Sequence, residues 1–193
     1  EFLGNEQTGR LVGKGFDDRA GCAVIIQTLR ELQDTDFAGE VVAIFTVQEE
    51  VGLRGAQVAA RNVEADVAIA LDTTAVSDTP EETMDQTLHL GRGTGVKVID
   101  FSLIAHPVVK EKLLHLAKDK NIQFQHEVFP GIGTDGGAVS LANKGIPTGV
   151  LSIPSRYAHS PVEVIDLGDL EATKELLKEF ILSLKEDTSF SFI

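Results

Sequence analysis

Sulfur-containing residues and tryptophan are almost absent from this sequence of 193 residues. It contains one cysteine, Cys22, one methionine and no tryptophan. A single cysteine excludes an internal disulfide and is typical of a reducing compartment, so we expect a cytoplasmic protein. The hydrophobic fraction of 42% is sufficient for the core of one domain.

Basic residues are also scarce. Lysine and arginine number 17 against 30 aspartates and glutamates, which gives a formal net charge of −13. This balance argues against nucleic acids and anionic membrane surfaces as partners. No apolar run is long enough to span a bilayer, and the first residues lack a signal-peptide pattern. We therefore expect neither nucleic acid nor membrane as a partner.

The remaining sequence alternates between two hydrophobic periods. Short apolar runs rich in β-branched residues predict strands, and apolar residues three or four apart predict helices. Strands are expected at 41–47, 67–71, 96–101, 123–129 and 148–153, and helices at about 20–32, 54–61, 107–120, 136–143 and 170–184. A polar stretch, 73–87, is expected to be an exposed loop. Strands separated by helices predict a three-layer α/β/α sandwich with a largely parallel mixed sheet, in which an antiparallel strand is possible.

Two adjacent carboxylates, Glu49 and Glu50, follow the apolar run 41–47. The carboxyl ends of buried strands are where open α/β sheets build their sites. Adjacent side chains point in different directions, so one can bind a metal ion while the other transfers a proton, as metal-assisted hydrolysis requires. Taken alone, the pair also fits a solvated acidic turn.

Further candidate ligands stand at comparable places along the chain. These are Asp17 and Asp18 before the helix at 20–32, Asp72 after the strand at 67–71, and His159 after the strand at 148–153. Carboxyl ends of parallel strands meet at one edge, so these side chains can converge with Glu50. Carboxylates with one imidazole suit zinc, cobalt or manganese.

Each of these residues also has a simpler explanation. Asp17 and Asp18 fit the N-cap of a helix, because aspartate favours that position. Asp72 fits a turn after its strand, and His159 fits a hydrogen-bonded loop histidine. Their joint occurrence at successive strand and helix ends favours the metal site.

A glycine-rich segment, 131–137, is the candidate wall of a substrate pocket. Four glycines in seven residues allow backbone to approach a ligand closely, and Thr134 and Asp135 offer side-chain oxygens beside Gly136. The alternative is a flexible turn that leads into the next helix with Asp135 as its cap.

Several of these segments, in this order, resemble the deblocking and glutamyl aminopeptidases, a family of metallopeptidases with two metal ions that often form tetrahedral particles. The resemblance rests on six motifs: Phe16-Asp17-Asp18-Arg19-Ala20-Gly21-Cys22, Gln48-Glu49-Glu50-Val51-Gly52-Leu53-Arg54-Gly55, Ala70-Leu71-Asp72-Thr73-Thr74, Gly133-Thr134-Asp135-Gly136-Gly137, Gly145-Ile146-Pro147-Thr148 and Pro154-Ser155-Arg156-Tyr157-Ala158-His159-Ser160. Together they cover essentially the whole chain.

The resemblance implies a role for each matching residue. Asp17 bridges two divalent ions, zinc or cobalt, and Asp18 orients it. Glu50 and His159 complete the first metal site, and Asp72 belongs to the second. Glu49 is the general base, which takes a proton from the attacking water and returns it to the leaving amine. The implied substrates are peptides, cleaved after their first residue, and the complete protein is expected to be a homo-oligomer.

The chain also departs from that family. Its members carry a further metal-binding histidine in an upstream His-x-Asp motif and an inserted dimerisation domain, and neither is found in residues 1–193. We therefore interpret the chain as the carboxyl-terminal portion of a single catalytic domain. Alternatives are another metal-dependent hydrolase on the same scaffold, such as a deacylase, or an inactive fragment that lacks one ligand.

Overall fold

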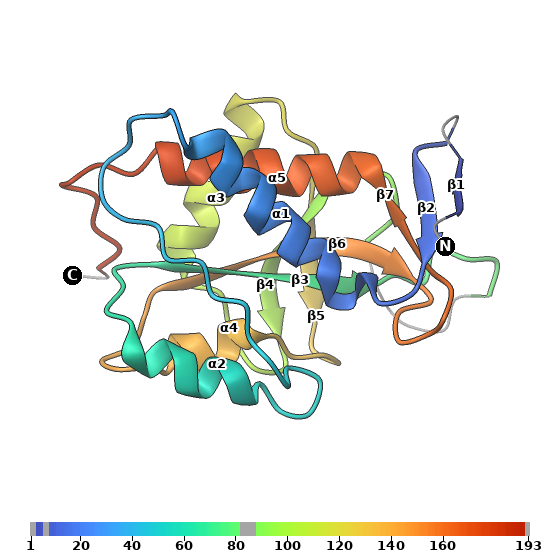
Figure 1. The fold of residues 1–193 in the computed structure, drawn as a ribbon, viewed down its shortest axis with the longest axis horizontal. Coiled ribbons are helices and arrows are strands. Elements are labelled where there is room, and N and C mark those ends of the chain that lie inside the picture. The colour runs from blue at the N-terminus through green and yellow to red at the C-terminus, as the bar shows by residue number, and fades with distance from the viewer. Residues whose placement is uncertain (1–2, 6–7, 82–87, 192–193) are drawn as a thin grey trace.

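A mixed β-sheet lies between two layers of helices in the computed structural model, which describes residues 3–5, 8–81 and 88–191 (Figure 1). One layer contains α1 (Phe16–Leu32), α3 (Pro107–Asp119) and α5 (Leu167–Leu182). The other contains α2 (Arg54–Ala59), with a 3₁₀ turn at Ala60–Asn62, and α4 (Asp135–Ser140). The predicted three-layer α/β architecture is confirmed.

The sheet is built around one long central strand. The strands are β1 (Leu3–Asn5), β2 (Arg10–Gly13), β3 (Ala68–Ala75), β4 (Thr94–Asp100), β5 (Phe124–Phe129), β6 (Thr148–Arg156) and β7 (Glu163–Asp166). In the described part of the chain their order is β1-β2-β7-β6-β4-β5, and β3 pairs with β6 outside this path. The longest pairings, β3 with β6 and β4 with β5, are parallel, and the shorter ones are antiparallel. The sheet is therefore mixed, with more antiparallel pairing than we expected.

The main core lies between the sheet and the layer of α1, α3 and α5. Val24 of α1, Leu113 of α3 and Leu176 of α5 are buried against Leu151 and Ile153 of β6. These helical residues belong to the apolar stripes that predicted the helices, because residues three and four apart share one face. The core fixes the position of β6, and therefore the loop after it, relative to the start of α1.

The expected strand at 41–47 is wrong for this structure. The segment is extended, but it is not paired with any described strand, and Val42 and Phe45 are 52% and 50% exposed. It crosses from the layer of α1 to that of α2 in front of the sheet (Figure 1). Apolar β-branched composition favours a strand only where a partner strand is available, and none is available here.

Three short strands, β1, β2 and β7, were not predicted, because none has a long apolar run. The expected loop at 73–87 begins later than predicted, since β3 continues to Ala75, and 82–87 lie outside the described residues. Within the described ranges, no helix is both long and apolar enough to cross a membrane.

Candidate active site

Three predicted ligands from distant parts of the chain meet at one point. The Nε2 atom of His159 lies 3.0 Å from Asp17 Oδ2 and 3.1 Å from Glu50 Oε2. One donor atom from each residue lies within 4.8 Å of the others, and this is the single such group among the described residues. The predicted convergence of Asp17, Glu50 and His159 is therefore present.

The start of α1 holds Asp17 outside the helical conformation. Asp17 and Asp18 have non-helical backbone angles although they belong to the first turn. The Glu163 carboxylate accepts hydrogen bonds from the backbone N–H groups of Phe16, at 2.5 Å, and Asp17, at 3.3 Å. Asp18 Oδ1 accepts one from Gly21 N at 2.9 Å. The helix-cap interpretation thus fits Asp18, and the Asp17 side chain remains directed to His159.

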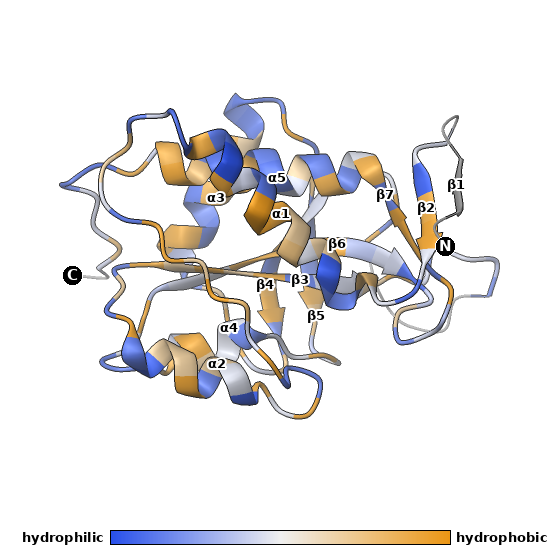
Figure 2. Cartoon of the chain, viewed as in Figure 1, coloured by the Kyte–Doolittle hydropathy of each residue, from blue (hydrophilic) through white to orange (hydrophobic). Residues whose placement is uncertain are grey.

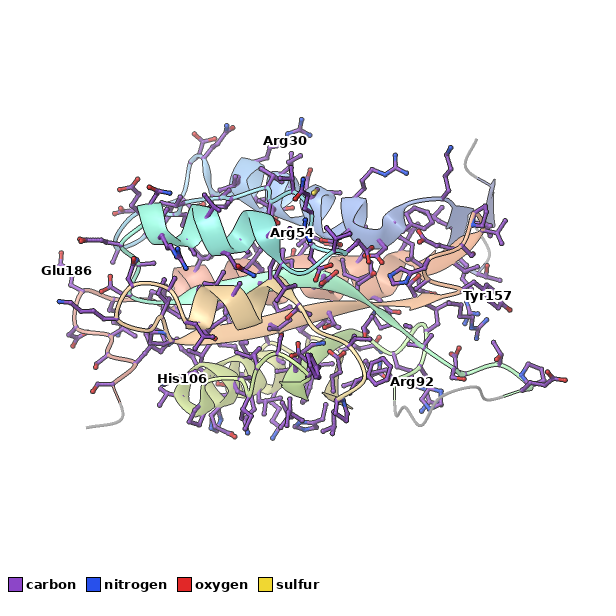
Figure 3. The ribbon with its side chains drawn as sticks, turned by 90° about the horizontal axis from the view of Figure 1, so that it is seen from below. Arg30, Arg54, Arg92, His106, Tyr157 and Glu186 are labelled. Atoms are coloured by element: carbon purple, nitrogen blue, oxygen red, sulfur yellow. The ribbon has the colours of Figure 1, made fainter. Side chains whose placement is uncertain are left out.

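Tight turns present the other two ligands. The carbonyl of Glu49 accepts hydrogen bonds from the N–H groups of Gly52, at 3.0 Å, and Leu53, at 2.8 Å. His159 has a positive φ of 62° and lies three residues after β6 ends. Tyr157, in the same loop, lies at the opposite end of the molecule from Glu186 (Figure 3). An ion pair between Arg156 and Asp78 fixes the base of this loop.

Asp72 lines the same cavity as Asp17 and Glu50, but it is not one of the three residues whose donor atoms meet. It is buried within β3 rather than at its end, and its Oδ1 accepts a hydrogen bond from Thr73 N at 2.8 Å. Burial, followed by the negative charges of Asp18 and Glu49, raises its pKa well above the ordinary value. Asp72 is thus in the same acidic site, next to the three-residue group.

Burial and mutual repulsion raise the pKa values of the neighbouring acids. Burial raises the pKa of Asp18 to about 8, against the opposing effect of the Gly21 amide. Burial, with the charges of Asp135 and Glu50, raises the pKa of Glu49 to about 7. Burial and the charge of Asp17 also raise the pKa of Glu50. Carboxylates held together in this way favour either protons or a cation between them.

The donor set fits a divalent transition metal. Two carboxylate oxygens and one imidazole nitrogen are ligands that zinc accepts, and three protein ligands are usual where a water completes the site. Asp17, Glu49, Glu50 and Asp72 also line one cavity of about 970 Å³, which gives a ligand access to them. Asp17, Glu50 and His159 are therefore the residues that could hold an ion.

The predicted substrate wall at 131–137 has two different parts. Thr134 is fully buried, and its hydroxyl donates to Asp100 Oδ2 at 2.9 Å. Gly136 is also buried, and a Cβ there would lie 2.9 Å from Val150 Cγ2. Asp135 instead lines the cavity and accepts a hydrogen bond from the Thr46 hydroxyl. Of these three, Asp135 alone faces the cavity.

Sequence reasoning missed Glu163. It lies 147 residues after Phe16 and is 2% exposed, yet it orients the backbone at Asp17. It stands in the four-residue strand β7, which has no recognisable motif, so the sequence held no signal that could have identified it.

Comparison with known proteins shows the family of this chain. The profile of the M42 glutamyl aminopeptidase family matches residues 3–176. The chain belongs to this family. A protein of Acetivibrio thermocellus, named as a candidate aminopeptidase, is 44% identical over 182 residues, which cover 93% of this chain and 54% of that protein. The glutamyl aminopeptidase of Lactococcus lactis is 33% identical, with 92% of this chain and 49% of the relative covered.

Several solved structures share the fold. An aminopeptidase from Desulfurococcus kamchatkensis has a TM-score of 0.90 at 40% identity, covering 96% of this chain and 52% of that one. A TET aminopeptidase from a marine-sediment Thaumarchaeota archaeon has a TM-score of 0.92 at 34% identity, covering 96% and 53%. A Thermotoga maritima structure titled an endoglucanase has a TM-score of 0.72 at 32% identity, covering 94% and 51%. The chain spans about half the length of the relatives it matches.

Proposed function

We propose that the complete protein is a metal-dependent aminopeptidase that releases the N-terminal residue of peptides. The observation that carries this proposal is the convergence of Asp17, Glu50 and His159, within 4.8 Å of one another, in a chain of the M42 family. A bound divalent ion would activate water and polarise the scissile carbonyl. Side chains of the protein would transfer the protons and contact the substrate.

Glu49 is the proposed general base. Its carboxylate would take a proton from the attacking water and return it to the leaving amine. Glu49 lines the same cavity as Asp17 and Glu50, and burial is the first cause that raises the pKa of its carboxyl above the ordinary value. Asp135, which also lines the cavity, is the proposed contact for the substrate.

We infer that a second ion would share Asp17 and would bind Asp72. Two carboxylates without an imidazole hold a transition metal weakly, so this site needs a donor from elsewhere. Residues 1–193 contain no His-x-Asp motif. The proposed source is the His-x-Asp segment of the complete protein, and the 193 residues would then be one portion of the catalytic domain. The half-length match to the relatives supports this inference.

The complete protein is also proposed to be a homo-oligomer. A Pyrococcus horikoshii TET1 peptidase, whose structure is similar at a TM-score of 0.82 and 33% identity, is described as assembling into a tetrahedron or an octahedral shell. Size-exclusion chromatography with light scattering would test this, and a monomeric complete protein would contradict it.

Two substitutions at neighbouring residues test the proposed roles in the complete enzyme. Glu49→Gln should keep metal content and lose turnover by on the order of 10²-fold or more, because it removes the base alone. Glu50→Gln should lower metal content and activity together. Glu111→Gln, at an exposed position on α3, is the matched control and should change neither. Near-normal turnover of Glu49→Gln would remove Glu49 from the role of base.

Chelation distinguishes the peptidase from a glycosidase. A glycosidase uses two carboxylates on either side of a sugar bond and needs no metal. Peptidase activity should therefore disappear with EDTA and return with zinc or cobalt. Cleavage of a β-glucan that persists in EDTA would contradict the proposal.

A further inference from the structure

The loop that carries His159 has little packing of its own. It joins β6 to β7 over residues 157–162, and its side chains Tyr157 and Val162 are 55% and 57% exposed. Figure 2 shows hydrophobic colour in the first part of β6 and more hydrophilic colour towards its arrowhead, where the loop begins. His159 is also largely exposed, yet its Nε2 lies 3.0 Å from Asp17 Oδ2. Apolar burial therefore does not account for the position of the imidazole.

The backbone of this loop is strained at two places. Tyr157 and His159 have positive φ angles of 57° and 62°, a region that residues with a Cβ rarely adopt. Conformations of this kind persist only where the surrounding structure imposes them. Contacts at the ends of the loop must therefore hold it in place.

Glu163, the first residue of β7, holds the end of the loop. Its carboxylate is buried and accepts hydrogen bonds from the backbone N–H groups of Phe16 and Asp17. This contact joins the loop of His159 to the segment that carries Asp17. It does not reach the start of the loop, at Arg156.

Asp78 holds the start of the loop through Arg156, the last residue of β6. The guanidinium donates from two nitrogens, with Nε 2.5 Å from Asp78 Oδ1 and Nη2 3.1 Å from Asp78 Oδ2. Leu90 N donates to Asp78 Oδ2 at 2.9 Å. The Asp78 side chain is 8% exposed, and paired bonds between arginine and carboxylate fix orientation as well as distance. Arg156 is therefore held in one orientation where the loop begins.

The carboxyl of Asp78 is charged at neutral pH. Burial alone would raise its pKa, but the hydrogen bonds from Arg156 and Leu90 lower that pKa below the ordinary value. Asp78 follows β3, the strand that carries Asp72. The pair with Arg156 thus joins the segment after Asp72 to the loop of His159, as Glu163 joins that loop to Asp17.

We propose that Asp78 is a positioning residue for the metal site and acts through Arg156 on His159. It fixes the start of the loop, so that the imidazole meets Asp17 and Glu50. The inference rests on the metal site of the proposed function and adds to it a residue outside the three ligands. Contacts behind metal ligands typically contribute about 10- to 100-fold to metal affinity.

Zinc titration of the 193-residue chain by calorimetry tests this role. Asp78→Ala should weaken zinc affinity by about tenfold, at the low end of that range, because Asp78 acts on the loop rather than on the imidazole directly. Asp78→Asn keeps the size of the side chain and the acceptor for Leu90 N, so it tests the role even if Asp78→Ala does not fold. It should weaken affinity by about threefold or more, because the charged pair is lost. Unchanged affinity in Asp78→Asn would overturn the proposal.

A double-mutant cycle with His159→Ala separates positioning from a general loss of structure. In the His159→Ala background, Asp78→Ala should change the remaining, weaker zinc affinity by about twofold at most, because the residue through which it acts is gone. The same tenfold loss in both backgrounds would mean that Asp78 acts on the whole site rather than on His159. That result would overturn the proposal.

Glu179→Ala is the matched control. The Glu179 carboxylate pairs with Lys120 at 2.7 Å, and its side chain is 19% exposed. Glu179 lies in the last turn of α5, at the other end of that helix from β7. Its removal breaks an ion pair remote from the loop and should leave zinc affinity within about twofold. A loss as large as that of Asp78→Ala would overturn the proposal.

The same titration distinguishes this proposal from the proposed function. If the native chain binds zinc and the two Asp78 variants bind it equally well, the positioning role fails and the metal site stands. If the native chain binds no zinc, the metal site fails, and the positioning role fails with it. Weaker binding in the Asp78 variants, confined to chains that retain His159, is the result that we expect.

Discussion

Two groups of carboxylates in this protein differ in what balances their charge. On β4 and β5, Lys97 Nζ lies 2.9 Å from Glu127 Oε1 and 3.7 Å from Asp100 Oδ2, with all three side chains fully buried. Thr74 also donates a hydrogen bond to Glu127 Oε1 at 2.7 Å. This group, the Lys97 network, contains its own cation.

The acids that line the cavity contain no such cation. No lysine or arginine of the described residues forms an ion pair with Asp17, Glu50 or Asp72, and the basic partner of the first two is His159. Burial is the main cause that raises the pKa values of Glu50 and Asp72, and neighbouring negative charges raise them further. The fold supplies a counter-charge to the Lys97 network, whereas the cavity acids would receive theirs from a bound metal ion.

The largest expected effect is the removal of the cation from the Lys97 network. Lys97→Met should lower the free energy of unfolding by about 3–5 kcal/mol, because it leaves the charges of Glu127 and Asp100 buried without a cation. Urea denaturation would measure this.

The matched control for this change is Lys120→Met. Lys120 pairs with Glu179 at 2.7 Å but is half exposed, and exposed pairs contribute about 1 kcal/mol or less. Equal losses for the two variants would mean that burial does not distinguish the Lys97 network.

A change of intermediate size is expected from supplying the missing cation to the cavity acids. Zinc at one hundred times its dissociation constant should stabilise residues 1–193 by about 2.7 kcal/mol, by mass action. Glu50→Gln should abolish this gain while leaving metal-free stability unchanged or improved, because it removes repulsion. Thermal melts with and without zinc would show both. If Glu50→Gln without zinc lost as much stability as Lys97→Met, the two groups of carboxylates would not differ as described.

The smallest effect is expected where the counter-charge is present but near solvent. Glu31 of α1 accepts hydrogen bonds from Lys174 and Lys178 of α5 at 2.7 and 2.9 Å, which lower its pKa from 4.5 to about 2. Because the folded-state pKa is depressed, this stabilisation is present above pH 4.5 and disappears as the pH falls through about 2.

Comparison with Glu31→Gln over a pH series tests this linkage. The native chain should be slightly more stable than the variant at pH 7, and the difference should shrink between pH 4.5 and about 2. Urea midpoints at each pH would measure it. A difference that persists at the acid end would show that Glu31 contributes through packing rather than charge.

The sequence predicted the elements that carry regular apolar patterns, such as α1, α3, α5 and β6. It failed at 41–47, because strand formation depends on a partner that the pattern of one segment does not show. For the same reason β2 and β7 were missed, since pairing with each other and with β6 supports them more than their own composition.

For the site, the sequence predicted the meeting of Asp17, Glu50 and His159 from their places at the ends of expected elements and from the family motifs that contain them. The strand expected before Glu50 is not formed, yet Glu50 still reaches the other two residues. The sequence could not show that Thr134 turns inward to Asp100, because that depends on packing between distant segments. Glu163 was invisible for a similar reason, since its contacts to the start of α1 join parts of the chain that no local pattern connects.

Calorimetric titration of residues 1–193 with zinc tests the central claim most directly. We predict one tight ion per chain, lost in Glu50→Gln and His159→Ala and retained in Asp72→Asn, because Asp17, Glu50 and His159 provide one complete set of protein ligands. The same chain should show little or no aminopeptidase activity. Two tight ions per chain, or no tight ion at all, would contradict this assignment of the ligands.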